Sequence, residues 1–203
     1  MPSVAFEPRI VPDPPIWPQS VVTVVGNPKP ASRTATAATS VAELLASELG
    51  APFKVDALVD LVTFAPALFQ QVGESEDQIA LADAIDLATS ASVLVLATPV
   101  YKGSYTGLLK SFLDVLPPHA LAGSVVVPVT ISASPAHRLL ADLHLRPVLA
   151  ELGASVPTPP VALEERDLED LQLAVSAWVR HNAGLVQAAT IALQPVAEPT
   201  PAR

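Results

Sequence analysis

The 203-residue chain contains no cysteine, and this absence excludes several kinds of chemistry. Without thiols the protein has no disulfide bonds, no thiolate ligands for a metal and no cysteine nucleophile. Aromatic residues are also scarce, at 4% of the sequence, so the position of each tyrosine and tryptophan carries information. The lack of cysteine suits a reducing compartment, and we expect a cytoplasmic protein.

Basic residues are outnumbered, because 11 Lys and Arg stand against 20 Asp and Glu for a formal net charge of −9. No basic block is present, so neither nucleic acid nor a membrane surface is expected as the main partner. No apolar run approaches the roughly 18 residues of a membrane-spanning helix. The first residues lack the charged and apolar segments of a secretory signal. The four histidines lack metal-ligand spacing, so we expect no metal site.

Proline, by contrast, is abundant, with 22 residues unevenly spread along the chain. Six of them lie in the first 18 residues, where they remove backbone donors and favour extended conformations. We therefore expect a Pro-rich N-terminal arm over residues 1–19 and a disordered C-terminal tail over residues 195–203. Residues 20–194 then form one domain, since 50% of the chain is hydrophobic.

Between arm and tail, short apolar runs alternate with helical patterns. The runs at residues 21–25, 93–97 and 125–129 are rich in β-branched residues, which is typical of buried parallel strands. Weaker strands are expected at residues 53–60 and, limited by prolines, near 155–163. Helices are expected at residues 34–49, 78–89, 106–116, 135–151 and 168–193, with Glu164 and Glu165 near the start of the last one. The alternation predicts an α/β domain with a parallel sheet and helices on both faces.

The first corner between a strand and a helix, "GNPKPASRT", holds four candidate binding residues, Asn27, Ser32, Arg33 and Thr34. The helix that follows presents free N–H groups and a partial positive charge at its N-terminus, so hydroxyl groups and an arginine there suit a phosphate. Simple helix capping by Ser32 and Thr34 is the plainer alternative. The chain lacks both the G-x-G-x-x-G and the P-loop patterns, which disfavours a dinucleotide fold or a P-loop.

The second corner, "ATPVYKGSYTGLLKSFLD", follows a central apolar run and holds Pro99, Val100, Tyr101 and Lys102. In an open α/β sheet, ligands lie at the carboxyl ends of the strands. Backbone amides there suit the polar edge of a flat heterocycle, and a tyrosine supplies an apolar wall. A surface tyrosine beside a solvated lysine is the plainer alternative.

The third corner, "ISASPAH", holds three small residues that border the same ligand: Ser132, Ala133 and Ser134. Together with "AHRLLADLHLRPVLAELGA", the three corners resemble the NAD(P)H-dependent FMN reductases of the flavodoxin-like superfamily. The resemblance covers about residues 21–161 and is greatest to the alkanesulfonate-type reductases of two-component monooxygenase systems. It implies a flavodoxin-like, doubly wound, five-stranded parallel sheet of strand order 2-1-3-4-5.

The resemblance also implies ligands, partners and residue roles. The ligands are FMN and NAD(P)H, and the partner is a flavin-dependent monooxygenase. From the residues themselves we expect a homodimer or tetramer with residues 101–107 and the following helix at the interface, because tyrosines and Leu108, Leu109, Phe112 and Leu113 cover more than one face of that helix. The first corner then holds the FMN phosphate, the second lies along the isoalloxazine and ribityl chain, and the third borders the flavin's edge. No catalytic acid or base is implied, because the flavin itself takes the hydride.

Two departures from the family pattern affect these expectations. The third loop of close relatives is typically glycine-rich, whereas Ser132, Ala133 and Ser134 of this chain carry side chains. These side chains are expected to narrow the space at the flavin's edge and so to alter the affinity for FMN. In the alkanesulfonate-type reductases a tyrosine inserted in the fourth helix lies at a subunit interface. The corresponding part of this chain carries Leu143 and His144, so a different oligomer behaviour is expected.

Three alternative functions stay open on the sequence. A quinone or azo-compound reductase keeps its flavin bound and passes electrons to a second substrate in the same pocket. A flavodoxin-like carrier exchanges electrons with proteins and has no nicotinamide site. A non-catalytic flavin-binding or interaction protein has a degenerate pocket, and the "SAS" segment is the feature that supports it.

Overall fold

A computed structural model describes residues 19–70 and 75–194 of the chain. The expected tail at 195–203 and residues 1–18 of the expected arm lie outside the described residues. Gln19, which the sequence analysis assigned to the arm, is the first residue of a strand, where it pairs with Phe53. Within the described residues, no helix combines the length and apolar composition needed to cross a membrane.

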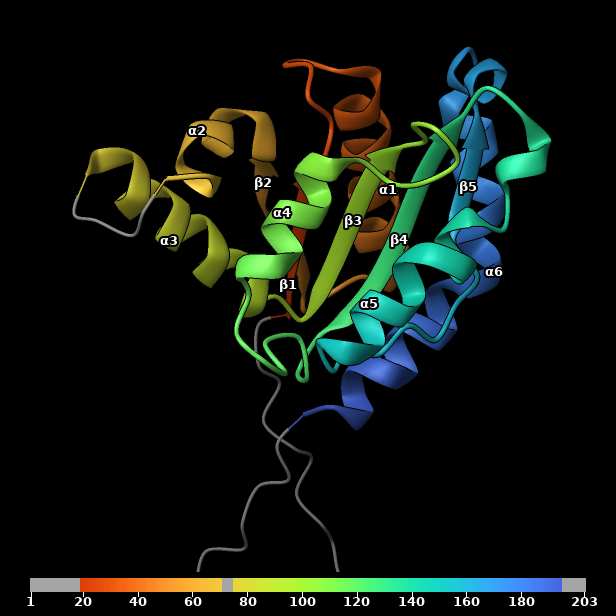
Figure 1. Ribbon diagram of the computed structural model, residues 1–203. Coiled ribbons are helices and arrows are strands. Elements are labelled where there is room, and N and C mark those ends of the chain that lie inside the picture. Colours follow the sequence, from red (N-terminus) through yellow and green to blue (C-terminus); the bar gives the residue numbers. More distant parts are fainter. Residues whose placement is uncertain (1–18, 71–74, 195–203) are drawn as a thin grey trace, which may run out of the picture.

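A five-stranded parallel sheet forms the centre of the molecule (Figure 1). Its order is β2-β1-β3-β4-β5, which confirms the predicted flavodoxin-like fold. The strands are β1 (Gln19–Val25), β2 (Phe53–Asp60), β3 (Val93–Pro99), β4 (Val125–Ser132) and β5 (Val161–Glu164). Every residue of β3 and β4 is buried, because helices cover both faces of the sheet and leave these strands no contact with water.

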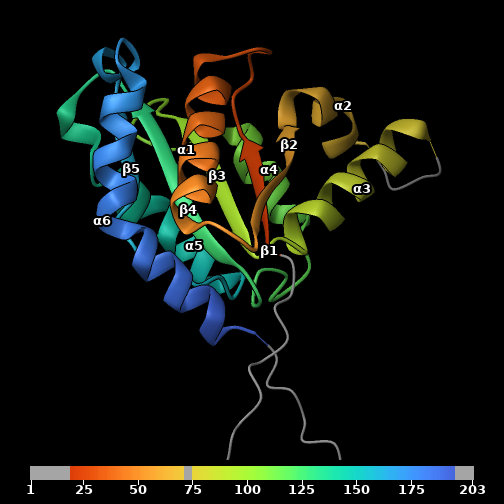
Figure 2. The same ribbon diagram turned by 180° about the vertical axis from the view of Figure 1, so that it is seen from behind.

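Two layers of helices cover the sheet, as Figures 1 and 2 show from opposite sides. One face carries α1 (Arg33–Leu49) and α6 (Leu171–Ala192). The other carries α3 (Glu76–Thr89), α4 (Gly107–Val115) and α5 (Arg146–Glu151). Strand side chains alternate between the two layers, so that Val93 and Val95 face α1 and α6 while Leu94 and Leu96 face the opposite layer.

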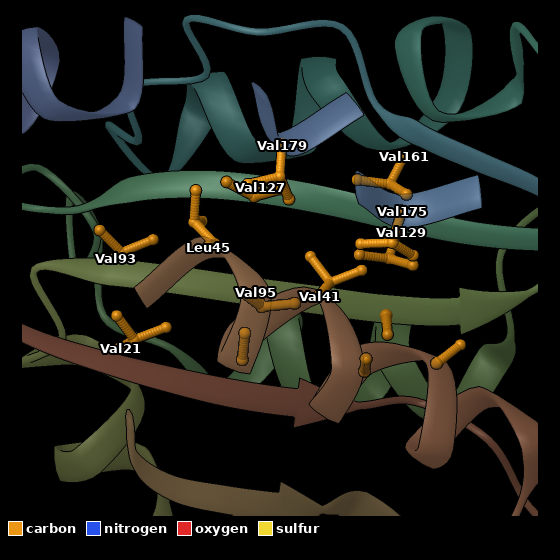
Figure 3. Close-up of a cluster of buried hydrophobic side chains, with 14 of the residues drawn as sticks. Val21, Val41, Leu45, Val93, Val95, Val127, Val129, Val161, Val175 and Val179 are labelled. Carbon is orange, nitrogen blue, oxygen red and sulfur yellow. The ribbon is translucent and has the colours of Figure 1, made fainter. Parts of the chain in front are cut away.

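The layer between the sheet and α1 with α6 is built almost entirely from valine, leucine and alanine (Figure 3). Val41 and Leu45 of α1 and Val175 of α6 are fully buried there against the strands. Val41 and Leu45 lie about one helical turn apart on α1, which is the spacing that turns an apolar stripe toward a sheet. This packing fixes where α1 begins relative to β1, and therefore where the first corner lies.

The structure corrects the predicted single helix at residues 135–151. A 3₁₀-helix η2 (Pro135–His137), a π-helix η3 (Ala141–Leu145) and α5 replace it. Pro147 explains part of this change, because it lacks an N–H and cannot donate to the carbonyl four residues earlier. A wide π turn just before it accommodates the missing bond.

Two other differences are local. The chain after β2 forms the short helices η1 (Leu61–Phe64) and α2 (Ala65–Leu68), which the sequence analysis did not predict. Glu164 ends β5 instead of starting the last helix, and Glu165 begins a 3₁₀-helix, η4 (Glu165–Leu168), that precedes α6. The fifth strand is shorter than predicted because prolines at 157, 159 and 160 cannot donate to a ladder.

Candidate functional site

The first loop, residues 26–32, leads from β1 into α1 and is closed by its own side chains. The Asn27 side-chain amide donates to Thr34 Oγ1 at 2.8 Å, and Asn27 Oδ1 accepts from the backbone N–H of Lys29 at 3.0 Å. Ser32 is the N-cap of α1, where its hydroxyl accepts from Ala35 N at 3.2 Å. The capping interpretation of Ser32 is therefore right, and Asn27 and Thr34 shape the loop from within.

The N-terminus of α1 keeps the donors that suit an anion. The first N–H groups of a helix have no intrahelical acceptor, so those of Arg33 and Thr34 point out of the helix toward the loop. The Arg33 guanidinium lies at the rim, with 68% of its side chain exposed, and pairs with Glu165 at 3.4 Å. Arg33 is thus within the first corner as predicted, but in this structure its charge is directed toward η4.

The second loop, residues 100–106, is a tight hairpin at the carboxyl end of β3. Tyr101 and Ser104 exchange both backbone hydrogen bonds, at 2.9 and 3.1 Å. Lys102 and Gly103 between them have φ of 51° and 75°, which is the left-handed geometry of a two-residue type I′ turn. Val100 N donates to Ile131 O at 2.8 Å and so joins the hairpin to β4. The Tyr101 side chain remains 43% exposed beside this edge.

A pair of buried threonines, which the sequence analysis did not single out, links the first two loops. Thr106 Oγ1 donates to the carbonyl of Gly26 at 2.5 Å and accepts from Leu109 N at 3.1 Å, so it also caps α4. Thr106 N in turn donates to Thr98 Oγ1 at 3.2 Å. The sequence signal was available, because a threonine before an amphipathic stretch is typical of an N-cap.

Gly26 is required at this junction by close packing. A Cβ at this position would lie 2.6 Å from Leu109 Cβ and 3.2 Å from Leu109 Cα. No side chain fits there unless α4 moves away from the sheet. The absence of a side chain at Gly26 therefore lets α4 approach the first loop.

The third loop, residues 132–134, leads from β4 into η2. Ser132 is buried and its hydroxyl donates to the carbonyl of Ser134 at 2.9 Å. Ser134 Oγ accepts from Ala136 N at 3.3 Å and caps η2, while Ala133 is exposed. Both serines thus act within the loop, and they compact the segment that is glycine-rich in the family pattern.

The three loops lie side by side at the carboxyl edge of the sheet because β1, β3 and β4 are neighbours. Val25 is in register with Ala97, and Pro99 with Ile131. All eleven predicted binding residues are therefore brought to one edge. The second loop lies between the other two. It is joined to the first loop by the hydrogen bond from Thr106 to Gly26 and to β4, which leads into the third loop, by the bond from Val100 to Ile131.

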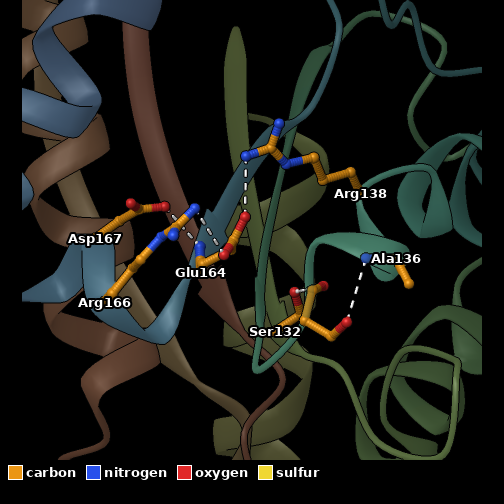
Figure 4. A network of polar contacts seen from close by, with 7 residues as sticks. Ser132, Ala136, Arg138, Glu164, Arg166 and Asp167 are labelled. Atoms are coloured by element: carbon orange, nitrogen blue, oxygen red, sulfur yellow. Dashed lines mark hydrogen bonds and ion pairs between the residues drawn. The ribbon is translucent and has the colours of Figure 1, made fainter.

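An ion-pair cluster at the end of β5 borders the same edge and was missed by the sequence analysis (Figure 4). The Glu164 side chain is only 8% exposed and accepts from Arg138 at 2.9 Å and from Arg166 at 3.1 Å. Its backbone N–H donates to Asp167 Oδ2 at 2.7 Å. The arginines lie on either side of a nearly buried carboxylate and satisfy its two oxygens separately.

Asp60 is a further acidic residue at this edge, but it lies on the far side of β1 from the second and third loops. It ends β2 in register with Val25, and its Oδ1 is buried without a hydrogen-bond partner among the described residues. Burial raises the pKa of the Asp60 carboxyl, although a hydrogen bond from the Val62 backbone acts in the opposite direction. We therefore expect the titration of Asp60 to affect the stability of the fold.

The structure also has a hollow of about 680 Å³ away from these loops. It is lined by the C-terminal part of α3 and the segment before β4: Asp83, Ile85, Asp86, Leu87, Thr89, Ser90, Pro117 and Ala120. No strand end contributes to this lining. Within residues 19–70 and 75–194, no three His, Asp or Glu side chains lie together as a metal site requires.

Residues 20–167 match the family described as NADPH-dependent FMN reductase. An FMN reductase (NADPH) of Escherichia coli K12 is 45% identical over 78 residues, which are 38% of this chain and 41% of that protein. The match therefore spans less than half the length of this curated relative. An FMN reductase (NADPH) of Pseudomonas aeruginosa is 29% identical over 157 residues, or 77% of this chain and 82% of that one.

Solved structures agree with this assignment. The apo form of an NADH:FMN oxidoreductase (EMOB) superposes with a TM-score of 0.70 at 32% identity, covering 89% of this chain and 92% of the other. A parallel sheet in this order with three loops at its carboxyl edge defines a flavodoxin-like protein. More particularly, the chain belongs to the NADPH-dependent FMN reductase family, which confirms the resemblance stated from the sequence.

The donor set at the carboxyl edge fits FMN. A flavin phosphate needs N–H and hydroxyl donors, and the N-terminus of α1 supplies both. A flat ring needs an apolar wall and accessible backbone. Tyr101 offers an exposed aromatic side chain, and Gly103 of the same turn has open space, since a Cβ added there would meet nothing within 4 Å. The residues present are therefore compatible with this cofactor.

Proposed function

We propose that this chain is an NAD(P)H-dependent FMN reductase that supplies reduced FMN to a partner monooxygenase. The observation that carries the proposal is the convergence of three loops on the carboxyl edge of β1, β3 and β4, in a chain of the FMN reductase family. That edge is where open α/β sheets bind their ligands. Reduction of FMN by a nicotinamide is the activity for which the family is named.

Each loop has a distinct task in this proposal. Asn27, Ser32, Arg33 and Thr34 hold the phosphate; Pro99, Val100, Tyr101 and Lys102 lie along the ring and ribityl chain; and Ser132, Ala133 and Ser134 border the ring's edge. Bound FMN supplies the redox chemistry by accepting a hydride from the nicotinamide. The chain's own residues position and enclose the flavin. The tight turn at Lys102 holds Tyr101, which forms the wall of the site.

Assembly and location are further parts of the proposal. We infer a homodimer or tetramer in which Leu109 and Phe112 take no part, because these two side chains of α4 are buried within the chain itself. The exposed side chains of Leu139 and Leu143 support an interface around η3 instead. His144 of η3 lies 3.2 Å from Ser104, which brings that interface beside the second loop. The absence of cysteine is compatible with a cytoplasmic location.

Flavin binding tests the proposed phosphate site. FMN is expected to bind more tightly than riboflavin, because only FMN carries the phosphate that the N-terminus of α1 suits. Arg33→Ala is expected to weaken FMN binding about tenfold, which corresponds to about 1.5 kcal/mol. This value is at the low end of the range for charge-assisted hydrogen bonds, because Arg33 is exposed. Riboflavin affinity stays unchanged.

Fluorescence titration of the two flavins measures both affinities. Arg180→Ala on α6 is the matched control, because it removes the same charge from the outside of the domain. Equal affinities for FMN and riboflavin, with no effect of Arg33→Ala, would rule out the phosphate assignment.

A further inference from the structure

Two residues of the segment that contains the third loop lie against the same residue of the neighbouring strand, Glu164. Ser132, where the loop begins, is in register with Glu164 in the β4–β5 ladder. Arg138, which follows η2, donates to Glu164 Oε1 at 2.9 Å. Ser132, at one end of the segment at residues 132–138, thus lies beside Glu164 in the sheet, and Arg138, at the other end, binds the Glu164 side chain (Figure 4).

Glu164 is suited to this task because its side chain is nearly buried. A buried carboxylate is costly unless it is paired, so Glu164 holds its partners more firmly than an exposed glutamate does. Arg138 and Arg166 remain 60% and 72% exposed, so neither is immobilised by burial. Their positions depend on the carboxylate between them.

The two arginines share the carboxylate but belong to different parts of the fold. Arg138 lies on the segment that leaves the third loop, whereas Arg166 lies in η4, which leaves β5. Within the loop, the side chains of Ser132 and Ser134 make short-range bonds, to the carbonyl of Ser134 and to the N–H of Ala136. The Arg138–Glu164 pair therefore anchors the loop to the rest of the domain.

We propose that Glu164 is a positioning residue for the flavin site, acting through Arg138 to hold the third loop in the shape that borders the flavin ring. The inference rests on the proposed function only in naming flavin as the ligand. The loop's dependence on Arg138 is a property of the chain itself.

The test compares Arg138→Ala with Arg166→Ala, two variants that remove the same side chain from the same carboxylate. Arg138→Ala is expected to weaken FMN and riboflavin binding alike, by about tenfold, because the third loop meets the ring and not the phosphate. Arg166→Ala is expected to change neither affinity by more than about twofold. Arg138→Lys, which keeps the charge, is expected to restore most of the affinity.

Hydrogen exchange in the absence of flavin supplies a readout that does not depend on the ligand. Backbone amides of residues 132–138 are expected to exchange faster in Arg138→Ala than in the wild type and to be unchanged in Arg166→Ala. Glu164→Gln, if it folds, is expected to behave like Arg138→Ala. The double variant Arg138→Ala/Glu164→Gln then adds little to either single change.

The outcomes separate the two proposals. Equal effects of Arg138→Ala and Arg166→Ala on loop exchange and on flavin affinity would show that the arginines merely neutralise a buried charge, and would overturn the inference. If the wild-type chain binds no flavin, the proposed function fails. The exchange comparison alone then decides whether Arg138 anchors the loop.

Discussion

At the scale of single residues, the carboxyl edge is held together by small side chains that each satisfy more than one backbone group. Thr106 is the clearest example, because its hydroxyl joins the first loop to the start of α4 while its N–H reaches Thr98. Gly26 contributes in the opposite way, by having no side chain where Leu109 packs. Both residues set the position of α4 relative to the first loop.

Thr106→Val tests this role. The valine keeps the shape but leaves the carbonyl of Gly26 and the N–H of Leu109 without their partner, so the variant is expected to lose about 2 to 3 kcal/mol of stability. Urea unfolding measures the loss. Thr39→Val, at a half-buried position on α1, is the control and is expected to change stability by less than about 0.5 kcal/mol. A loss no larger than that of the control contradicts the assigned role.

Gly26→Ala is expected to destabilise the domain by about 1 to 3 kcal/mol, because the added methyl group meets Leu109 and α4 must shift. Thermal unfolding checks this value. Gly123→Ala provides the comparison, since a Cβ at Gly123 meets nothing within 4 Å. If both variants are equally stable, the close approach of α4 to the first loop is wrong.

Asp60 gives the protein a predictable dependence on pH. Between the ordinary carboxyl pKa of about 3.9 and the raised pKa of Asp60, the folded protein holds a proton that the unfolded chain has lost. Stability therefore falls as pH rises through that window. Relative to Asp60→Asn, the wild type is expected to lose stability over this range and then to stay level.

Urea unfolding of both proteins from about pH 4 to pH 7 measures the difference. Asp56→Asn, exposed on the same strand, is the control and is expected to keep the pH dependence of the wild type. An Asp60→Asn variant with an unchanged pH profile shows that the carboxyl is not perturbed by burial.

At the scale of elements, the sequence allowed the strands and most helices to be predicted because their residues carry the pattern themselves. The β-branched runs of β1, β3 and β4 and the capping serine of α1 are local signals. The break of residues 135–151 into η2, η3 and α5 was not predicted, because a proline in a helical pattern allows either a kink or a new start.

The ion pairs around Glu164 could not be predicted for a different reason. Arg138 and Glu164 are 26 residues apart and meet only when β5 pairs with β4. The predicted site residues came from three loops that follow strands, a pattern visible in the sequence. The residues that support those loops do so through tertiary contacts, and such contacts leave no periodicity or motif in the sequence.

The hairpin turn of the second loop is the element most open to a direct test. Gly103 has φ of 75°, a conformation that costs a residue with a side chain about 1 to 2 kcal/mol. Gly103→Ala is therefore expected to loosen the turn and to speed hydrogen exchange at residues 100–106. Gly107→Ala, where the added methyl group also meets open space but φ is not left-handed, is expected to leave exchange unchanged. Equal exchange in both variants rejects the rigid turn.

At the scale of the whole molecule, the proposed oligomer accounts for large apolar side chains that the monomer leaves in water. Leu139 and Leu143 are 63% and 66% exposed. Leu109, Phe112 and Leu113 of the predicted interface on α4 are not available, because these side chains fill the core beneath the helix. The segment around η3 is a candidate that lies beside the second loop.

Leu143→Glu is expected to shift the protein to monomers, because a carboxylate at a subunit interface is costly to desolvate. Sedimentation velocity at micromolar concentration measures the change. Leu185→Glu on the exposed face of α6 is the matched control and is expected to leave assembly intact. A wild-type chain that sediments as a monomer contradicts the proposal.

The central claim is that FMN is a substrate of this chain which leaves after reduction. The direct measurement is the initial rate of NADH or NADPH oxidation, taken with each nicotinamide separately as FMN is added to the purified chain. We predict a negligible rate without added FMN, a rate that saturates as FMN rises, and reduced FMN free in anaerobic solution. A chain that purifies with stoichiometric flavin, ignores added FMN and reduces quinones would instead be a bound-flavin reductase. A chain that binds flavin but never oxidises a nicotinamide would be a carrier, and either result contradicts the claim.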